Sequence, residues 1–313
     1  MVSERLIKRI EGARKLSWKY HSKRITFYLP GMFYLDGKTG LYPAVSVTGR
    51  QCALQCKHCR GKLLETMVPA KSSEQLISLA RQWKKDGIIG ILLSGGSNLD
   101  GVVPLEPIIP AIPKLKKMGF FVSAHTGFVT PGLAGSLKEA GIDQILLDVV
   151  GDDLVIKDVL NLDGGTSLIS SALDAAFSAN LQVVPHIIVG LGGEISGEYN
   201  ALEMLRDYPV KILSYVVLMP AVALGDAIPP ISLEDVLDVI VTGREVFPDI
   251  IQTLGCARPR GKYRLELERS AIRAGINRMA LWSDDAINEA KKLGLDIEFR
   301  KTCCSVPPDI IKE

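Results

Sequence analysis

The chain has 313 residues, of which 37 are basic, 35 are acidic and 47% are hydrophobic. This length and apolar content allow a full buried core, which excludes intrinsic disorder and any need for disulfide cross-links. A net charge of +2 gives no electrostatic footprint for a nucleic-acid partner. Residues 1–21 are charged throughout, so we expect no secretory signal. The longest charge-free stretches, such as 118–137 and 175–193, contain Pro, Gly and His, so we expect no membrane span and a cytoplasmic protein whose thiols stay reduced.

Apolar runs alternate with amphipathic segments along most of the chain. A helix is predicted over 3–19, and a Gly/Pro-rich aromatic segment follows over 27–42. Eight strands are then predicted over 42–47, 88–94, 120–124, 144–150, 183–189, 212–219, 250–254 and 278–282. The predicted helices between and after them cover 73–85, 106–118, 132–140, 166–179, 197–206, 233–246, 263–274 and 284–293. This alternation predicts an α/β protein with a parallel sheet, most simply a (β/α)8 barrel of the TIM type.

The pattern indicates one domain in three parts. Residues 1–41 are expected to form an N-terminal cap, 42–295 the barrel, and 296–313 a C-terminal tail. In such barrels the chemistry lies at the carboxyl ends of the strands.

Three of the six cysteines, Cys52, Cys56 and Cys59, follow the first predicted barrel strand. Their thiolates can converge on one metal site in a reducing compartment. Structural zinc would need a fourth ligand, for which His58 is the nearby candidate. An iron–sulfur cluster held by three thiolates would leave one iron open, and the residue pattern favours this reading.

The spacing CxxxCxxC resembles the signature of the radical S-adenosylmethionine (radical SAM) superfamily. The resemblance implies that Cys52, Cys56 and Cys59 hold a 4Fe–4S cluster whose open iron binds SAM. It further implies that one electron cleaves SAM to a 5′-deoxyadenosyl radical, which abstracts hydrogen from the substrate. Gly95 and Gly96 resemble the glycine pair that meets the amino group of SAM, but Ser97 stands where the superfamily usually has an acidic residue.

Four further residues are candidate contacts for SAM or the substrate. The resemblance places His58 beside the adenine. Asp148 is predicted either to accept hydrogen bonds from the ribose hydroxyls or to be a paired buried acid. His125 and His186, on the third and fifth strands, are expected either to contact SAM or substrate or to be structural histidines.

The remaining cysteines, Cys256, Cys303 and Cys304, lie far downstream. A tail returning over the carboxyl ends of the strands would bring the three thiols together. The alternative for Cys303 and Cys304 is a vicinal disulfide, which cytoplasmic conditions would reduce. We therefore expect an auxiliary iron–sulfur cluster.

The whole pattern looks like the biotin synthase-related branch, and most like a subunit of the archaeal two-protein lipoyl synthases. This likeness implies a second, auxiliary 4Fe–4S cluster on Cys256, Cys303 and Cys304 that is consumed as the sulfur source. Ser305 would be its fourth ligand by analogy, with Arg258 or Arg278 as the alternative.

The likeness also implies the reaction and the partners. The substrate would be an octanoyl group on a lysine of a lipoyl-carrier protein or lipoyl-domain peptide. The partners would be the second radical SAM subunit and a low-potential electron donor. The alternatives are another biotin synthase-like reaction with structural auxiliary cysteines, and a non-catalytic iron–sulfur protein.

Overall fold

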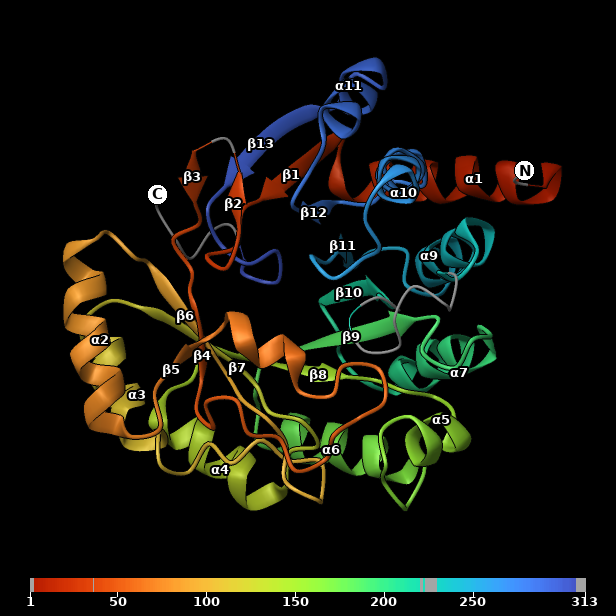
Figure 1. Cartoon of the computed structure of the whole chain (residues 1–313). Coiled ribbons are helices and arrows are strands. Elements are labelled where there is room, and N and C mark those ends of the chain that lie inside the picture. The colour runs from red at the N-terminus through yellow and green to blue at the C-terminus, as the bar shows by residue number, and fades with distance from the viewer. Residues whose placement is uncertain (1–2, 36, 220–221, 223–229, 308–313) are drawn as a thin grey trace. The chain divides into compact units, whose positions relative to one another are not determined.

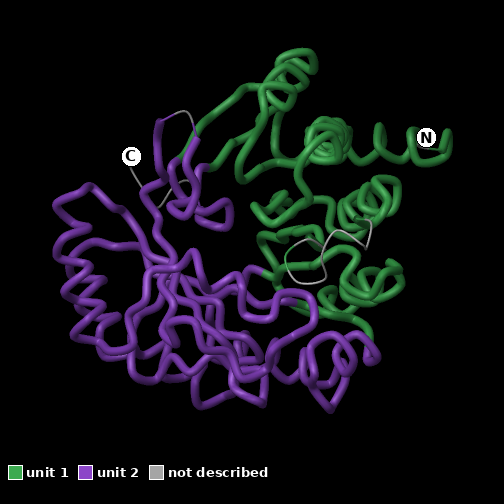
Figure 2. The backbone as a smooth tube through the Cα atoms, in the orientation of Figure 1, with its two compact units in different colours: residues 1–28, 149–152, 185–300 green, residues 29–148, 153–184, 301–313 purple. Residues whose placement is uncertain are grey.

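The computed structural model describes residues 3–35, 37–219, 222 and 230–307 of the chain. Helices and parallel strands alternate along it in a mixed α/β fold (Figure 1). The chain divides into two compact units, which Figure 2 colours separately. Unit 1 comprises residues 1–28, 149–152 and 185–300, and unit 2 comprises residues 29–148, 153–184 and 301–313. The α/β class with parallel strands, as predicted for a TIM-type barrel, is confirmed.

Unit 2 contains five parallel strands in the spatial order β8-β7-β6-β4-β5. These are β4 (Ala44–Ser46), β5 (Val68–Pro69), β6 (Gly90–Ser94), β7 (Phe121–His125) and β8 (Gln144–Asp148). Its helices are α2 (Ser73–Lys85), α3 (Ile112–Lys117), α4 (Pro131–Ala140), α5 (Asp153–Asp158) and α6 (Ser167–Ser178), with the 3-10 turns η1 (Lys62–Thr66) and η2 (Ile109–Ala111). A short hairpin joins β2 (Tyr34–Leu35) to β3 (Lys38–Thr39).

Unit 1 carries parallel strands in the order β13-β1-β12-β11-β10-β9. These are β1 (Arg24–Tyr28), β9 (Val183–Val189, which begins in unit 2), β10 (Ile212–Val217), β11 (Ile251–Leu254), β12 (Arg278–Ala280) and β13 (Asp296–Arg300). The helices are α1 (Glu4–His21), α7 (Ser196–Met204), α9 (Leu233–Val246), α10 (Lys262–Arg273) and α11 (Asp284–Lys292), with η3 (Leu205–Asp207) after α7. No helix in the described part of the chain is long and apolar enough to cross a membrane.

Five of the described strands were not predicted: the two-residue strands β2, β3 and β5, and the longer strands β1 and β13. β1 and β13 pair in parallel with each other, in the register Arg24 to Asp296 through Tyr28 to Arg300. Both begin with a charged residue, and β13 alternates polar with apolar residues instead of forming the apolar run expected of a strand buried on both faces. They lie in the segments for which the sequence predicts a cap and a tail.

The sheet of unit 2 has one apolar and one partly polar face. Because side chains alternate along a strand, residues aligned across neighbouring strands share a face. The apolar face carries fully buried residues from each long strand: Val45, Ile91, Leu93, Val122, Ala124, Ile145 and Leu147. The opposite face, called here the polar face of unit 2, carries Ser46, Ser94, Ser123, His125, Gln144 and Asp148. Polar groups on a sheet face of a barrel protein mark where a ligand would lie.

Candidate functional site

The cysteine loop follows the carboxyl end of β4 and is fixed within unit 2. The Asn161 side-chain amide donates to the carbonyls of Leu54 at 2.9 Å and Gln55 at 3.2 Å. The Lys57 amide donates to the Val159 carbonyl at 2.8 Å. Gln55 and Arg60 have φ angles of 48° and 47°, in the left-handed region that non-glycine residues seldom adopt. The segment after α5 therefore holds the loop in a strained backbone conformation of the kind found at functional sites.

Residues 95–97 lie against this loop, at the carboxyl end of β6. The Gly96 amide donates to Thr48 Oγ1 at 2.7 Å, and the Ser97 carbonyl accepts a 2.9 Å bond from the Ala53 amide. A Cβ atom on Gly96 would lie 2.1 Å from the Gln51 carbonyl oxygen, so position 96 requires glycine. The glycine pair predicted from the sequence therefore lies where the end of β6 and the cysteine loop are in close backbone contact. The hydrogen bond between Gly96 and Thr48 was not predicted.

The thiols of the loop influence one another. Burial, followed by the charges of Cys59 and Cys52, raises the pKa of Cys56 to about 12. Burial likewise raises the pKa of Cys59. Across the described residues, no three His, Cys, Asp or Glu side chains are already gathered closely enough to hold a metal ion. The donor set nevertheless fits an iron–sulfur cluster, because iron replaces the thiol protons and relieves the repulsion between thiolates.

His58 and Asp148, two further predicted contacts for SAM, lie close enough to interact electrostatically. Burial lowers the pKa of His58, and the Asp148 carboxylate opposes this shift. Within the described residues, His58 Nδ1 is buried without a hydrogen-bond partner. A buried polar atom without a partner is costly, so a ligand that bonds to Nδ1 would be favoured here. This observation fits the predicted adenine contact.

His125, the last residue of β7, lies on the polar face of unit 2. Burial lowers its pKa to about 4, so the imidazole is neutral at neutral pH. It can therefore donate a hydrogen bond from one ring nitrogen and accept one at the other.

His186 lies in unit 1, on β9, and is buried. It is aligned with a polar residue on each following strand of that sheet: Ser214, Thr253, Arg278 and Thr26. The roles predicted for His186 and Arg278 stay predictions.

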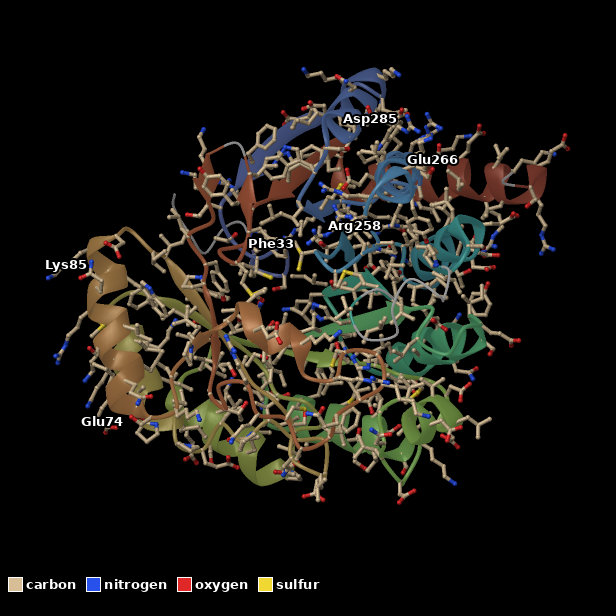
Figure 3. All side chains as sticks on the ribbon, in the orientation of Figure 1. Phe33, Glu74, Lys85, Arg258, Glu266 and Asp285 are labelled. Atoms are coloured by element: carbon tan, nitrogen blue, oxygen red, sulfur yellow. The ribbon has the colours of Figure 1, made fainter. Side chains whose placement is uncertain are left out.

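Cys256 follows the carboxyl end of β11 in unit 1, and Arg258 fixes its loop. Figure 3 shows Arg258 in the interior, whereas Glu266 and Asp285 project at the surface of the unit. The Arg258 guanidinium pairs with the buried Glu268 carboxylate at 2.6 Å. It also donates to the carbonyls of Gly255, Ala280 and Leu281. These bonds make Arg258 a structural residue of the Cys256 loop and count against the alternative that it ligates iron.

Cys303, Cys304 and Ser305 lie in unit 2, at the amino ends of its strands. The Leu41 amide, just before β4, donates to the Lys301 carbonyl at 2.6 Å. Cys303 packs with Tyr42, two residues before β4, and with Phe121, the first residue of β7. The expectation that the tail returns over the carboxyl ends of the strands is therefore wrong for this segment: buried apolar contacts hold it at the opposite end. Whether Cys256 joins these two thiols stays a prediction.

Hydrogen bonds connect the side chains of the Cys303–Ser305 segment. No disulfide joins Cys303 to Cys304, so the vicinal disulfide is not formed. The Ser305 hydroxyl donates to Cys303 Sγ at 3.2 Å. Hydrogen bonds from the Cys304 thiol, and then from the Ser305 hydroxyl and backbone amides, lower the pKa of Cys303 to about 6. Two thiols and one hydroxyl thus lie together, as an auxiliary metal site would need.

Two polar residues of this architecture were not predicted as site residues. Gln144, the first residue of β8, donates from Nε2 to Ser305 Oγ at 3.0 Å. Glu198 of α7 accepts a 2.6 Å bond from the Gly190 amide in the turn after β9. Burial raises the pKa of Glu198 to about 7. The only sequence signal for Gln144 is a polar residue at the start of an apolar run.

Comparison with known proteins identifies the superfamily. Residues 46–205, more than half of the chain, match the family model of the radical SAM superfamily. No curated protein matches the sequence. Among solved structures, methylornithine synthase (PylB) is similar with 14% identity and a TM-score of 0.65, over 96% of this chain and 91% of that one.

Two other solved structures have comparable folds. HydG, a maturase of the [FeFe]-hydrogenase, gives 17% identity and a TM-score of 0.67, over 95% of this chain and 69% of that one. Streptococcus suis SuiB bound to S-adenosylmethionine gives 12% identity and a TM-score of 0.54, over 77% and 58%. At these identities the likeness concerns the fold alone.

Proposed function

Because the chain belongs to the radical SAM superfamily, we propose that it is a sulfur-insertion enzyme of that superfamily, one component of a lipoyl synthase. Its substrate is an octanoyl group attached to a lysine of a lipoyl-carrier protein. The protein works in the cytoplasm with a second radical SAM subunit and a low-potential electron donor, where reducing conditions keep its thiols available for iron.

The superfamily implies a 4Fe–4S cluster and SAM, and the residues proposed to bind them lie in unit 2. Cys52, Cys56 and Cys59 would hold the cluster. When bound, the cluster and SAM supply a carbon radical that abstracts hydrogen from an unactivated C–H bond. Gly96 keeps the strand end close to the cysteine loop, and His58 offers a buried nitrogen to the ligand. The reaction requires surroundings that shield the carbon radical from water.

The observation that carries the proposal is the placement of two cysteine segments at opposite ends of the strands of unit 2. The Cys52–Cys59 loop follows the carboxyl end of β4, and Cys303 packs beside its amino end. Four residue steps separate Gln144 from Asp148, which corresponds to about 13 Å along β8. Because the carbon that loses hydrogen must also form the C–S bond, the proposal requires the substrate or the Cys303 segment to move so that this carbon reaches the sulfur donor.

The second site provides what a sulfur donor requires. Cys303, Cys304 and Ser305 would be ligands of an auxiliary iron–sulfur cluster. Their segment is packed on the sheet through Val306 and Tyr42, yet Cys303 itself is only partly buried. A partly exposed thiol beside a packed segment allows a cluster to be rebuilt after each loss of sulfur.

The test is SAM-dependent thiolation of an octanoylated lipoyl-domain peptide by the reconstituted protein under dithionite, with and without the partner subunit. Mass spectrometry is expected to detect a thiolated octanoyl product, accompanied by 5′-deoxyadenosine, that is lost in Cys303→Ala. If 5′-deoxyadenosine forms without any thiolated product in the presence of the partner, sulfur insertion into this substrate is excluded. If no 5′-deoxyadenosine forms, the radical chemistry fails as well.

A further inference from the structure

The Ser305 hydroxyl takes part in two hydrogen bonds: it accepts one from Gln144 and donates the other to Cys303. The Gln144 amide donates to Ser305 Oγ at 3.0 Å, and the Ser305 hydroxyl donates its proton to Cys303 Sγ at 3.2 Å. A serine hydroxyl has one proton and two lone pairs. The first bond occupies one lone pair and the second occupies the proton. One lone pair is left, and its direction is set by the other two bonds.

Gln144 is itself rigidly placed. Its side chain is 2% exposed and Ser305 is fully buried, so neither can exchange its partner for water. Its backbone is in register with Ser123 on β7, whose hydroxyl is bonded to the Tyr42 hydroxyl at 2.7 Å. The aligned residues Ser123 and Gln144 thus each belong to a polar pair. The pair through Gln144 is hydrogen-bonded to the cysteine segment, whereas the pair through Ser123 meets it only through the packing of Tyr42 against Cys303.

We propose that Gln144 is a positioning residue of the auxiliary site, which orients the Ser305 hydroxyl so that its free lone pair is presented to iron bound by Cys303 and Cys304. This role rests on the proposed function, because it assumes that these cysteines hold a cluster. Partners that orient a metal ligand commonly change metal affinity 10- to 100-fold, on the order expected here.

The variants are made in a protein that cannot load the first site. In the Cys52→Ala/Cys56→Ala/Cys59→Ala parent, reconstituted iron reports the auxiliary site alone. Gln144→Ala removes the donor, and Gln144→Glu replaces the donating amide by a carboxyl group of the same shape. Ser305→Ala removes the oriented hydroxyl. Ser123→Ala is the matched control, since it removes the other buried polar pair but keeps both hydrogen bonds of Ser305 and the Tyr42 ring that packs against Cys303.

The readouts are the electron paramagnetic resonance spectrum of the reduced cluster and the rate of iron loss to a chelator. Gln144→Ala, Gln144→Glu and Ser305→Ala are each expected to shift the spectrum and to speed iron loss about 10-fold or more. The double variant Gln144→Ala/Ser305→Ala should be no worse than Ser305→Ala, because Gln144 acts through Ser305. Ser123→Ala should keep the spectrum and the rate of the parent.

Each failure has its own signature. Consider first a parent that binds the cluster. If the Gln144 variants then match the parent, or if their effect adds in full to that of Ser305→Ala, the positioning role is overturned and the proposed function still stands. A Ser123→Ala variant as impaired as Gln144→Ala also overturns the role, because general disruption of the aligned polar pairs would then explain both. A parent that binds no iron removes the auxiliary cluster, and with it both the positioning role and the proposed sulfur source.

Discussion

A Cβ atom on Gly96 would lie 2.5 Å from the Cα atom of Cys52. The strand end that carries Gly96 and the loop that carries the first cysteine are therefore in direct backbone contact. The contact links the glycine pair of the sequence to the cysteine motif 44 positions earlier, and it leaves no room for any side chain.

Gly96→Ala should therefore displace the cysteine loop. Overpacking of this kind costs about 1–3 kcal/mol of unfolding free energy, and we expect reduced iron loading at the first site and loss of SAM cleavage. The control is Gly135→Ala in α4, where an added Cβ meets nothing within 4 Å. That variant should be neutral or more stable by up to about 1 kcal/mol. A Gly96→Ala protein with full iron and normal 5′-deoxyadenosine formation would refute the contact.

Glu268→Ala should be strongly destabilising. The Glu268 side chain is fully buried and pairs with Arg258 and Arg264, both at 2.6 Å. Removal of the carboxylate leaves the Arg258 charge buried without its partner, which costs about 3–5 kcal/mol. Glu203→Ala, whose side chain is 68% exposed beside Arg206, should cost less than about 1 kcal/mol. Chemical denaturation of the metal-free proteins gives both values, and equal losses would contradict the structural role of Arg258.

Glu198 should make the stability fall as the pH rises. Burial raises its pKa from 4.5 to about 7 in the folded protein, so the folded state binds the proton more tightly than the unfolded state. The favourable contribution is complete below pH 4.5 and is lost as the pH rises through about 7. The loss is at most about 3 kcal/mol.

The check is the difference in unfolding free energy between Glu198→Gln and the wild type, measured across this pH range. The variant should gain relative to the wild type as the pH rises, because its side chain does not ionise. A difference that stays constant from about pH 5 to pH 8 would show that the carboxyl group is not shifted.

Iron content should report two separate sites. After anaerobic reconstitution the wild type is expected to bind about eight irons, and both Cys52→Ala/Cys56→Ala/Cys59→Ala and Cys303→Ala/Cys304→Ala about four. Sulfide should follow the iron. About four irons in the wild type, unchanged in the Cys303→Ala/Cys304→Ala variant, would mean that the second cysteine group binds no cluster.

The sequence was sufficient for elements whose pattern is local. The eight strands predicted from apolar runs all form, and β9 has the predicted bounds. α2 and α9 also match residue for residue, because Ser72 and Ser232 cap them with side-chain bonds to Gln75 and Asp235. β1 and β13 were missed because their pairing with each other joins the two ends of the chain.

The site was predictable only in part, for the same reason. The approach of Gly96 to the Cys52 loop follows from a motif that a known superfamily shares. The bond between Gln144 and Ser305 spans 161 positions, and no local pattern marks either residue. The place of Cys303 at the amino ends of the strands likewise depends on its packing against Tyr42 and Phe121, which sequence spacing does not encode.

The most direct test of the account follows sulfur from the protein to the product. The protein is reconstituted with a heavy sulfur isotope in its iron–sulfur clusters, freed of unbound sulfide, and given SAM, dithionite, the partner subunit and an octanoylated lipoyl-domain peptide. The thiolated product is expected to carry the heavy isotope, and Cys303→Ala is expected to abolish this labelled product while still forming 5′-deoxyadenosine. A product that contains only unlabelled sulfur, or labelled product undiminished in Cys303→Ala, would contradict this expectation.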